Sequence, residues 1–167
     1  MIGTAEMRVL FTNTGSWGTG SFSSITAITE ELLSMGHDVK IVFPDNGDAS
    51  ADRSDYYGNP DVFHIWKFPI HNEKTRLDEY PLMIPDPNPR SPHGLTFKSL
   101  STEQQNLYFD AFEAFIQPLL NDYQPDIIDC QHIWSLDQVF KRLVIPYSCT
   151  AHHSDQIGFE YDIDRQP

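Results

Sequence analysis

The sequence predicts an α/β fold in which a doubly wound parallel sheet has helices on both faces. Short apolar runs with the length of strands alternate with longer segments whose apolar residues recur every three or four positions. A glycine-rich turn joins the first apolar run to the first helical segment. Strands that alternate with helices in this way form parallel sheets, and each element can be placed in order along the chain.

The first unit covers residues 7–43 and has the pattern of a strand, a helix and a second strand. The strands are expected at 7–12 and 38–43, and Pro44 to Gly47 end the second one. Between them Ser21 is expected to be the helix N-cap, and Gly36 is expected to end the helix. Its core-facing side has apolar residues at helical spacing: Phe22, Ile25, Ile28, Leu32 and Met35.

A third strand is expected at 62–68, after which residues 69–101 show no periodicity. This segment has six prolines, at 69, 81, 85, 87, 89 and 92. A connection of this length without regular structure is uncommon in a compact domain unless it has a function. We expect a long proline-rich loop that covers a ligand, and the alternative is a mobile insert.

The final part of the chain is expected to alternate helix, strand, helix and strand. Ser101 and Gln104 have the spacing of a capping box. The helix after them has one apolar face: Tyr108, Phe112, Phe115, Ile116, Leu119 and Tyr123. Pro118 predicts a kink near Ala114. Three elements follow: a strand at 125–131, a short helix at 135–143 and a strand at 145–150.

The chain is acidic, with 11 Lys and Arg against 24 Asp and Glu, which gives a formal net charge of −13. This balance argues against nucleic acid as a partner and against docking on anionic lipid by charge alone. Its 167 residues suggest a single domain, 1–167. The sequence shows neither a basic and apolar leader nor a transmembrane segment, so a cytoplasmic location is expected.

The carboxyl ends of the strands are where a doubly wound sheet binds ligands. Four segments follow predicted strands: Asn13–Gly20, Asp45–Asn46, His132–Trp134 and His152–Asp155. With a 3-2-1-4-5 strand order, the first and fourth strands are neighbours. The glycine turn and the His132 turn would then flank one crevice.

The glycine turn contains Gly18, Thr19 and Gly20 directly before a helix. Glycine lets backbone amides approach a ligand closely, and a helix N-terminus favours a phosphate or a sugar hydroxyl. Trp17 offers a stacking surface for a sugar ring, with a lid on the core as the alternative. Gly18-x-Gly20-x-x-Ser23 followed by Asp45 is close to the dinucleotide-binding pattern, so a nicotinamide-dependent enzyme is a rival hypothesis.

Histidines follow the fourth and fifth strands. His132 could donate to a phosphate or hydroxyl, and a half-buried structural histidine is the alternative. His152 and His153 are adjacent, so at most one is expected to face the crevice, and we favour His152. A metal site from His132, His152 and Asp155 is conceivable, but zinc-type spacing is missing and no metal is expected.

Cys130 and Cys149 are expected to be small core residues rather than nucleophiles. The sequence has no G-x-S-x-G elbow, Walker loop or C-x-x-C motif, so no nucleophile is evident.

Four stretches resemble the N-terminal, acceptor-side domain of retaining GT-B-fold glycosyltransferases, the group 1 or family 4-like type. They are residues 7–11 with the glycine turn and Gly36-His37-Asp38-Val39, residues 93–100 with Thr96-Phe97, Pro125 to Trp134, and Ile145-Pro146 with Thr150-Ala151-His152. Together they cover most of residues 7–153. The family often has His where this chain has Asp129 and Gln131, so the contacting residue at this turn is either Gln131 or His132.

The resemblance implies a Rossmann-like domain that works with a second, donor-binding domain, which this chain does not contain. The partners would be a nucleotide-sugar donor and a carbohydrate or lipid-linked acceptor, without a metal or other cofactor. The full-length enzyme would be cytoplasmic or peripheral at a membrane. The resemblance implies two catalytic residues, His132 and His152, and six substrate contacts: Trp17, Gly18, Thr19, Gly20, Gln131 and His153.

In that interpretation the donor diphosphate meets the amides of the glycine turn, while His132 and His152 position the acceptor or the sugar. Transfer with retention would proceed by front-side attack without a protein nucleophile. This chain alone is expected to be inactive. The rival hypotheses are a non-catalytic sugar- or phosphate-binding module and the nicotinamide-dependent enzyme.

Overall fold

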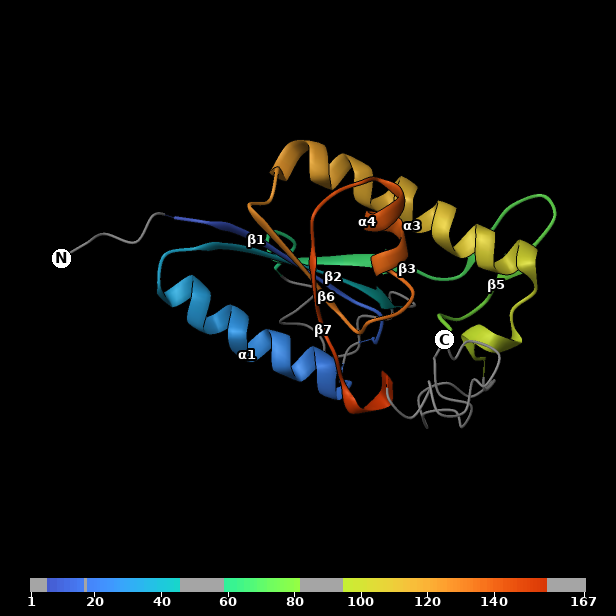
Figure 1. Ribbon diagram of the computed structural model, residues 1–167, viewed down its shortest axis with the longest axis horizontal. Helices are drawn as coiled ribbons and strands as arrows, with labels where there is room; N and C mark the ends of the chain where they lie inside the picture. Colours follow the sequence, from blue (N-terminus) through green and yellow to red (C-terminus); the bar gives the residue numbers. More distant parts are fainter. Residues whose placement is uncertain (1–5, 17, 46–58, 82–94, 156–167) are drawn as a thin grey trace.

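A five-stranded, all-parallel sheet lies at the centre of the computed structural model, which describes residues 6–16, 18–45, 59–81 and 95–155 (Figure 1). Its strand order is β3-β2-β1-β6-β7. This is the predicted 3-2-1-4-5 order, because β6 and β7 are the fourth and fifth strands that the sequence predicts. The α/β, Rossmann-like fold class is confirmed.

The described elements follow one another in this order: β1 (Arg8–Asn13), α1 (Gly20–Ser34), β2 (Asp38–Asp45), β3 (Phe63–Lys67), β4 (Ile70–His71), β5 (Arg76–Leu77), the 3₁₀ helix η2 (Phe97–Ser99), α3 (Thr102–Tyr123), β6 (Ile127–Gln131), α4 (Asp137–Arg142) and β7 (Ser148–Thr150).

Helices cover both faces of the sheet, with α1 on one side and α3 and α4 on the other (Figure 1). Successive side chains of a strand point to opposite faces, so each strand contributes to two cores. In β1, Val9 and Phe11 pack in the core beneath α1, whereas Leu10 packs in the core beneath α3. The central strand β1 is apolar on both faces because both faces are buried.

The ends of α1 were only partly predicted. Gly36 follows the C-cap Met35 with a φ of +87°, as the sequence indicated. The N-cap, however, is Thr19 rather than Ser21, and its Oγ1 accepts from the amide of Phe22 at 3.4 Å. Ser21 lies inside the first turn, where its hydroxyl has a different partner, described below.

The capping box at the start of α3 is confirmed. Ser101 Oγ accepts from the amide of Gln104 at 3.2 Å, and Gln104 Oε1 accepts from the amide of Ser101 at 3.0 Å. The helix then continues past Pro118 to Tyr123. Its apolar face packs against the sheet as predicted, with Phe115 and Leu119 only partly buried.

The segment 69–101 is more regular than the prolines suggested. Its described parts contain the antiparallel pair β4–β5 and the helix η2. Leu77, Phe97 and Leu100 are buried in the core on the α3 side. Apolar side chains anchor the segment there, so the expectation of a wholly irregular surface loop is wrong for these parts. Residues 82–94 lie outside the described residues.

The strand β7 is shorter than the predicted strand 145–150, and it pairs only with β6. An outer position of this kind leaves one side of the strand uncovered, and all three of its residues are exposed. Cys149 is therefore exposed, which corrects the prediction that both cysteines belong to the core. Cys130 is buried in β6, as predicted.

Within the described residues, no helix combines the length and the apolar character needed to cross a bilayer.

Candidate functional site

The carboxyl ends of three neighbouring strands form the candidate site. Asn13, Gln131 and Thr150 end β1, β6 and β7 and lie side by side in the register of the sheet. Figure 1 shows the N-terminal end of α1 beside the turn that follows β7. The structure thus brings the glycine turn, the His132 turn and the turn at His152 to one edge, which is where this fold class binds ligands.

His132 connects the first turn of α1 with the turn after β7. Its ring Nδ1 lies 2.7 Å from Asp155 Oδ1, and its Nε2 lies 3.1 Å from Ser21 Oγ. The side chains are nearly enclosed, with 8% of His132, 5% of Ser21 and 1% of Asp155 exposed. Three segments far apart in sequence therefore meet at one imidazole.

The partners of His132 define which ring nitrogen carries the proton. A carboxylate only accepts hydrogen bonds, so His132 Nδ1–H donates to Asp155. In the tautomer whose single ring proton is on Nδ1, the Nε2 atom is an acceptor. Ser21 Oγ also lies 3.3 Å from Thr19 Oγ1, whose own proton goes to the carbonyl of Ser16 at 2.9 Å. Only a proton donated by Ser21 satisfies Nε2, so the hydrogen bond runs from Ser21 to His132.

Asp155 is held as a carboxylate by two hydrogen bonds. Oδ1 faces His132, and Oδ2 accepts from the amide of His152 at 2.6 Å. Burial would raise the pKa of Asp155, but these hydrogen bonds outweigh it and lower the pKa below its usual value. Asp155 therefore remains charged at neutral pH and keeps the proton of His132 on Nδ1.

A second chain of hydrogen bonds, which runs from Asp129 through Gln131, orients His152. Asp129 accepts from the Ser148 hydroxyl at 2.7 Å, from the Thr150 hydroxyl at 3.0 Å and from the side-chain amide of Gln131. This turns Gln131 Oε1 toward His152 Nε2, 2.8 Å away, so Nε2 donates.

The two histidine rings, His132 and His152, lie 4.8 Å apart. Burial, and then the neighbouring His132, lower the pKa of His152 below its usual value. The site therefore holds two adjacent rings, each oriented by its own hydrogen-bonded partners.

The backbone at His132 is strained. Its φ is +85°, a conformation that side-chain-bearing residues rarely adopt, while its amide still donates to the carbonyl of Thr150 at 2.8 Å. Strained residues of this kind gather at functional sites. This conformation directs the chain out of β6 at the point where its side chain meets Ser21 and Asp155.

The glycines of the turn have different physical roles. Gly18 has a φ of +75°, which favours glycine. A Cβ on Gly15 would come within 2.7 Å of Thr19 Oγ1, the N-cap hydroxyl. A Cβ on Gly20 would meet nothing within 4 Å. The protein itself therefore does not require glycine at position 20, and space is open there for a ligand to approach the helix.

The remaining predicted residues fall in different places. Gln131 and His152 belong to the chain of hydrogen bonds that begins at Asp129, whereas His153 is exposed. Asp45 ends β2 on the same edge and is buried. Trp17 lies outside the described residues. Within the described parts of the chain, no group of three or more His, Cys, Asp and Glu residues has the arrangement of a metal site.

The sequence reasoning missed three residues of the site. It treated Ser21 as a helix cap and Asp155 only as a conceivable metal ligand. It placed Asn13 at a strand end but gave it no role; Asn13 is fully buried, its Oδ1 has no hydrogen-bond partner, and its amide donates to the Gly15 carbonyl. Its position at a predicted strand end is the one sequence feature that marks Asn13. Contacts between residues more than 100 positions apart, such as Ser21 and His132, leave no local pattern in the sequence.

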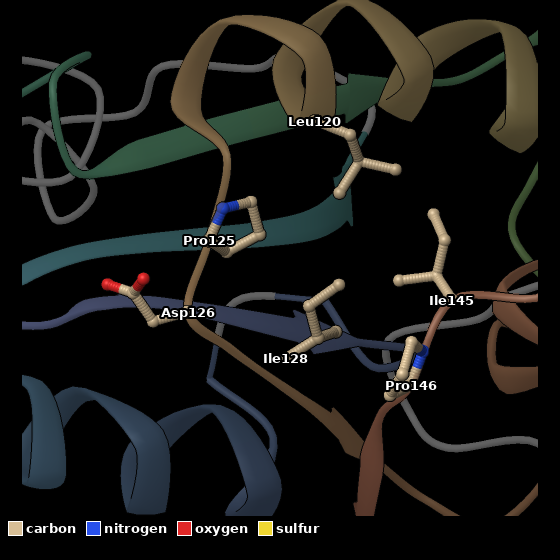
Figure 2. A pocket seen from close by; sticks show the side chains of 6 residues that line it. All are labelled: Leu120, Pro125, Asp126, Ile128, Ile145 and Pro146. Carbon is tan, nitrogen blue, oxygen red and sulfur yellow. The ribbon is translucent and has the colours of Figure 1, made fainter.

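A separate pocket of about 250 Å³ lies at the opposite end of β6 (Figure 2). Leu120, Ile128 and Ile145 point toward one another, while the Asp126 carboxylate points away from them and accepts from the Arg8 amide at 2.8 Å. Apart from Asp126, the residues that line this pocket are apolar.

No protein-family model matches the chain, and no curated protein sequence matches it.

Proposed function

We propose that this chain is the acceptor-side domain of a retaining GT-B-type glycosyltransferase, which moves a sugar from a nucleotide-sugar donor to an acceptor. The observation that supports it best is the convergence at the carboxyl edge. A helix N-terminus behind a glycine turn lies next to two oriented histidines from adjacent strand ends. The former suits a phosphate, and the latter suit sugar hydroxyls.

The first turn of α1 provides the anion-binding part. The amides of Gly20 and Ser21 precede the first intrahelical hydrogen bond, which runs from Ser23 to the carbonyl of Thr19. Together with the helix dipole they stabilise negative charge that develops on a leaving diphosphate. The open space beside Gly20 allows the close approach that such contacts need.

His132 would act on the sugar through Nε2. Both ring nitrogens are engaged, so a ligand reaches this ring only by displacing the Ser21 hydroxyl. A sugar hydroxyl in that place would donate to Nε2, as Ser21 does. Asp155 would stabilise the positive charge that the ring gains when it accepts the proton. A second domain would supply the remaining donor contacts and exclude water on closure.

The test is sugar transfer by the natural polypeptide that contains this domain, with radiolabelled UDP-, GDP- and ADP-sugars as donors. His132→Ala should lower turnover by more than about tenfold. His71→Ala replaces an exposed histidine on β4 and is the matched control, with turnover unchanged. Absence of transfer from every donor, or full activity in His132→Ala, would contradict the proposal.

A further inference from the structure

We propose that Ser21 is a nucleophile, activated by His132 and Asp155, that forms a covalent acyl–serine with carboxylic esters. The three side chains are linked in the order that serine hydrolases use: hydroxyl to Nε2 at 3.1 Å, and Nδ1 to carboxylate at 2.7 Å. This inference goes beyond sugar transfer and does not depend on it.

The arrangement differs from an ordinary helix-capping serine. Ser23 and Ser24, on the same turn, have hydroxyls that donate to the backbone carbonyls of Thr19 and Gly20, as serines in helices commonly do. Ser21 instead donates to an imidazole whose second nitrogen is held by a buried carboxylate. Of these three neighbouring serines, Ser21 alone has a general base.

The environment supports proton transfer. The three residues are at least nine-tenths buried, and electrostatic interactions are stronger where water is excluded. Asp155 accepts from His132 and from the amide of His152, so the carboxylate is fixed in position by two hydrogen bonds. It is a positioning residue that keeps the proton on Nδ1 and stabilises the imidazolium as it forms.

The reaction balances with water as the only co-reactant. Ser21 Oγ forms a bond to the ester carbonyl carbon, and its proton moves to His132 Nε2. The tetrahedral oxyanion then collapses, the carbon–oxygen bond to the alcohol breaks, and Nε2 returns the proton to that alcohol. Water attacks the acyl–serine in the same way and releases the acid.

The first turn of α1 offers donors for the oxyanion. The amides of Gly20 and Ser21 lie before the first i→i−4 bond of the helix and have no partner within it. They belong to the same turn as the nucleophile. Backbone amides that do not need to reorganise are effective stabilisers of this charge.

The test combines labelling and turnover on the chain as it stands. A fluorophosphonate probe should add one adduct, on the peptide that contains Ser21, and p-nitrophenyl acetate should be hydrolysed. Ser21→Ala should abolish both. Ser24→Ala, with an exposed serine on the same helix turn, is the matched control and should retain both. No adduct on Ser21, or labelling that persists in Ser21→Ala, would overturn the proposal.

Two further variants separate catalysis from folding. His132→Ala should lose labelling while its circular dichroism spectrum stays that of wild type. Asp155→Asn should lower the acylation rate at least tenfold and Asp155→Glu should restore part of it. Equal acylation rates in wild type and Asp155→Asn would overturn the role assigned to Asp155. Labelling without sugar transfer would refute only the proposed function, and transfer without labelling would refute only this inference.

Discussion

Replacing Asp155 with Asn tests the hydrogen-bond network that organises the candidate site. Asp155 is 1% exposed and receives two donors, His132 Nδ1–H at 2.7 Å and the His152 amide at 2.6 Å. Asn has one carbonyl oxygen, so one donor would face its NH₂ group instead. A hydrogen bond to a charged group contributes about 1.5–3 kcal/mol, and an unpaired buried donor costs about 1–3 kcal/mol.

We therefore expect Asp155→Asn to lower the free energy of unfolding by about 3 kcal/mol at pH 7. For a domain of this size that corresponds to a fall in melting temperature of roughly 6–12 °C. Urea denaturation followed by tryptophan fluorescence measures the loss. Asp122→Asn, an exposed aspartate on α3, is the matched control and should change stability by less than about 0.5 kcal/mol.

The pKa of Asp155 sets how the difference in the free energy of unfolding between wild type and Asp155→Asn changes with pH. Folding lowers the pKa of Asp155, so its contribution is present above the unfolded value of 3.8 and is lost as the pH falls through the lower folded pKa. The gap between wild type and Asp155→Asn should narrow below about pH 4. A gap under about 0.5 kcal/mol at pH 7, or one that stays constant into the acid range, would refute the network.

Two more outcomes follow from the turn and the cysteines. Gly20→Ala should leave the free energy of unfolding unchanged, because its Cβ meets nothing within 4 Å, but should weaken nucleotide-sugar binding at least tenfold. Gly18→Ala should lower the free energy of unfolding by about 1–2 kcal/mol, with or without a ligand, because the φ of residue 18 is +75°. Thermal melting measures the stability of each variant, and a titration with the nucleotide-sugar measures its binding. A thiol reagent should modify exposed Cys149 and leave buried Cys130 intact. Partial desolvation and the nearby carboxylates of Asp137 and Asp129 raise the pKa of Cys149 to about 11, so the rate should keep rising from pH 8 to pH 10, and modification of Cys130 first would contradict the structure.

The periodicity of the apolar residues and the positions of the glycines predicted most of the fold. The alternation of strands and helices indicated the fold class, whose usual strand order is the one observed. The Ser101–Gln104 capping box followed from spacing alone, because it depends on contacts close in sequence. The cores under the two faces were likewise implied by strands that are apolar on both sides. Residues 69–101 were misjudged in part, since buried Leu77 and Phe97 lie among prolines that hide their role.

The sequence predicted where the candidate site lies but not the hydrogen bonds that connect its residues. Strand ends placed His132 and His152 on one edge, but nothing local links Ser21 with a histidine 111 residues away. Asp155 stands three residues after His152, a spacing that also suits helix capping, and its amide-accepting oxygen does act in that way. Its second oxygen holds His132, which only the folded chain brings within reach.

Amide chemical shifts during a titration with UDP-glucose would test most directly whether the carboxyl edge is the binding site. Binding as weak as a millimolar Kd, about −4 kcal/mol, is measurable in this way. We predict that the amides of Gly18, Gly20 and His132 shift together, while those around Leu120 and Ile145, which line the pocket of Figure 2, stay fixed. No shift at the first group up to about 10 mM, or shifts confined to the second, would contradict the account.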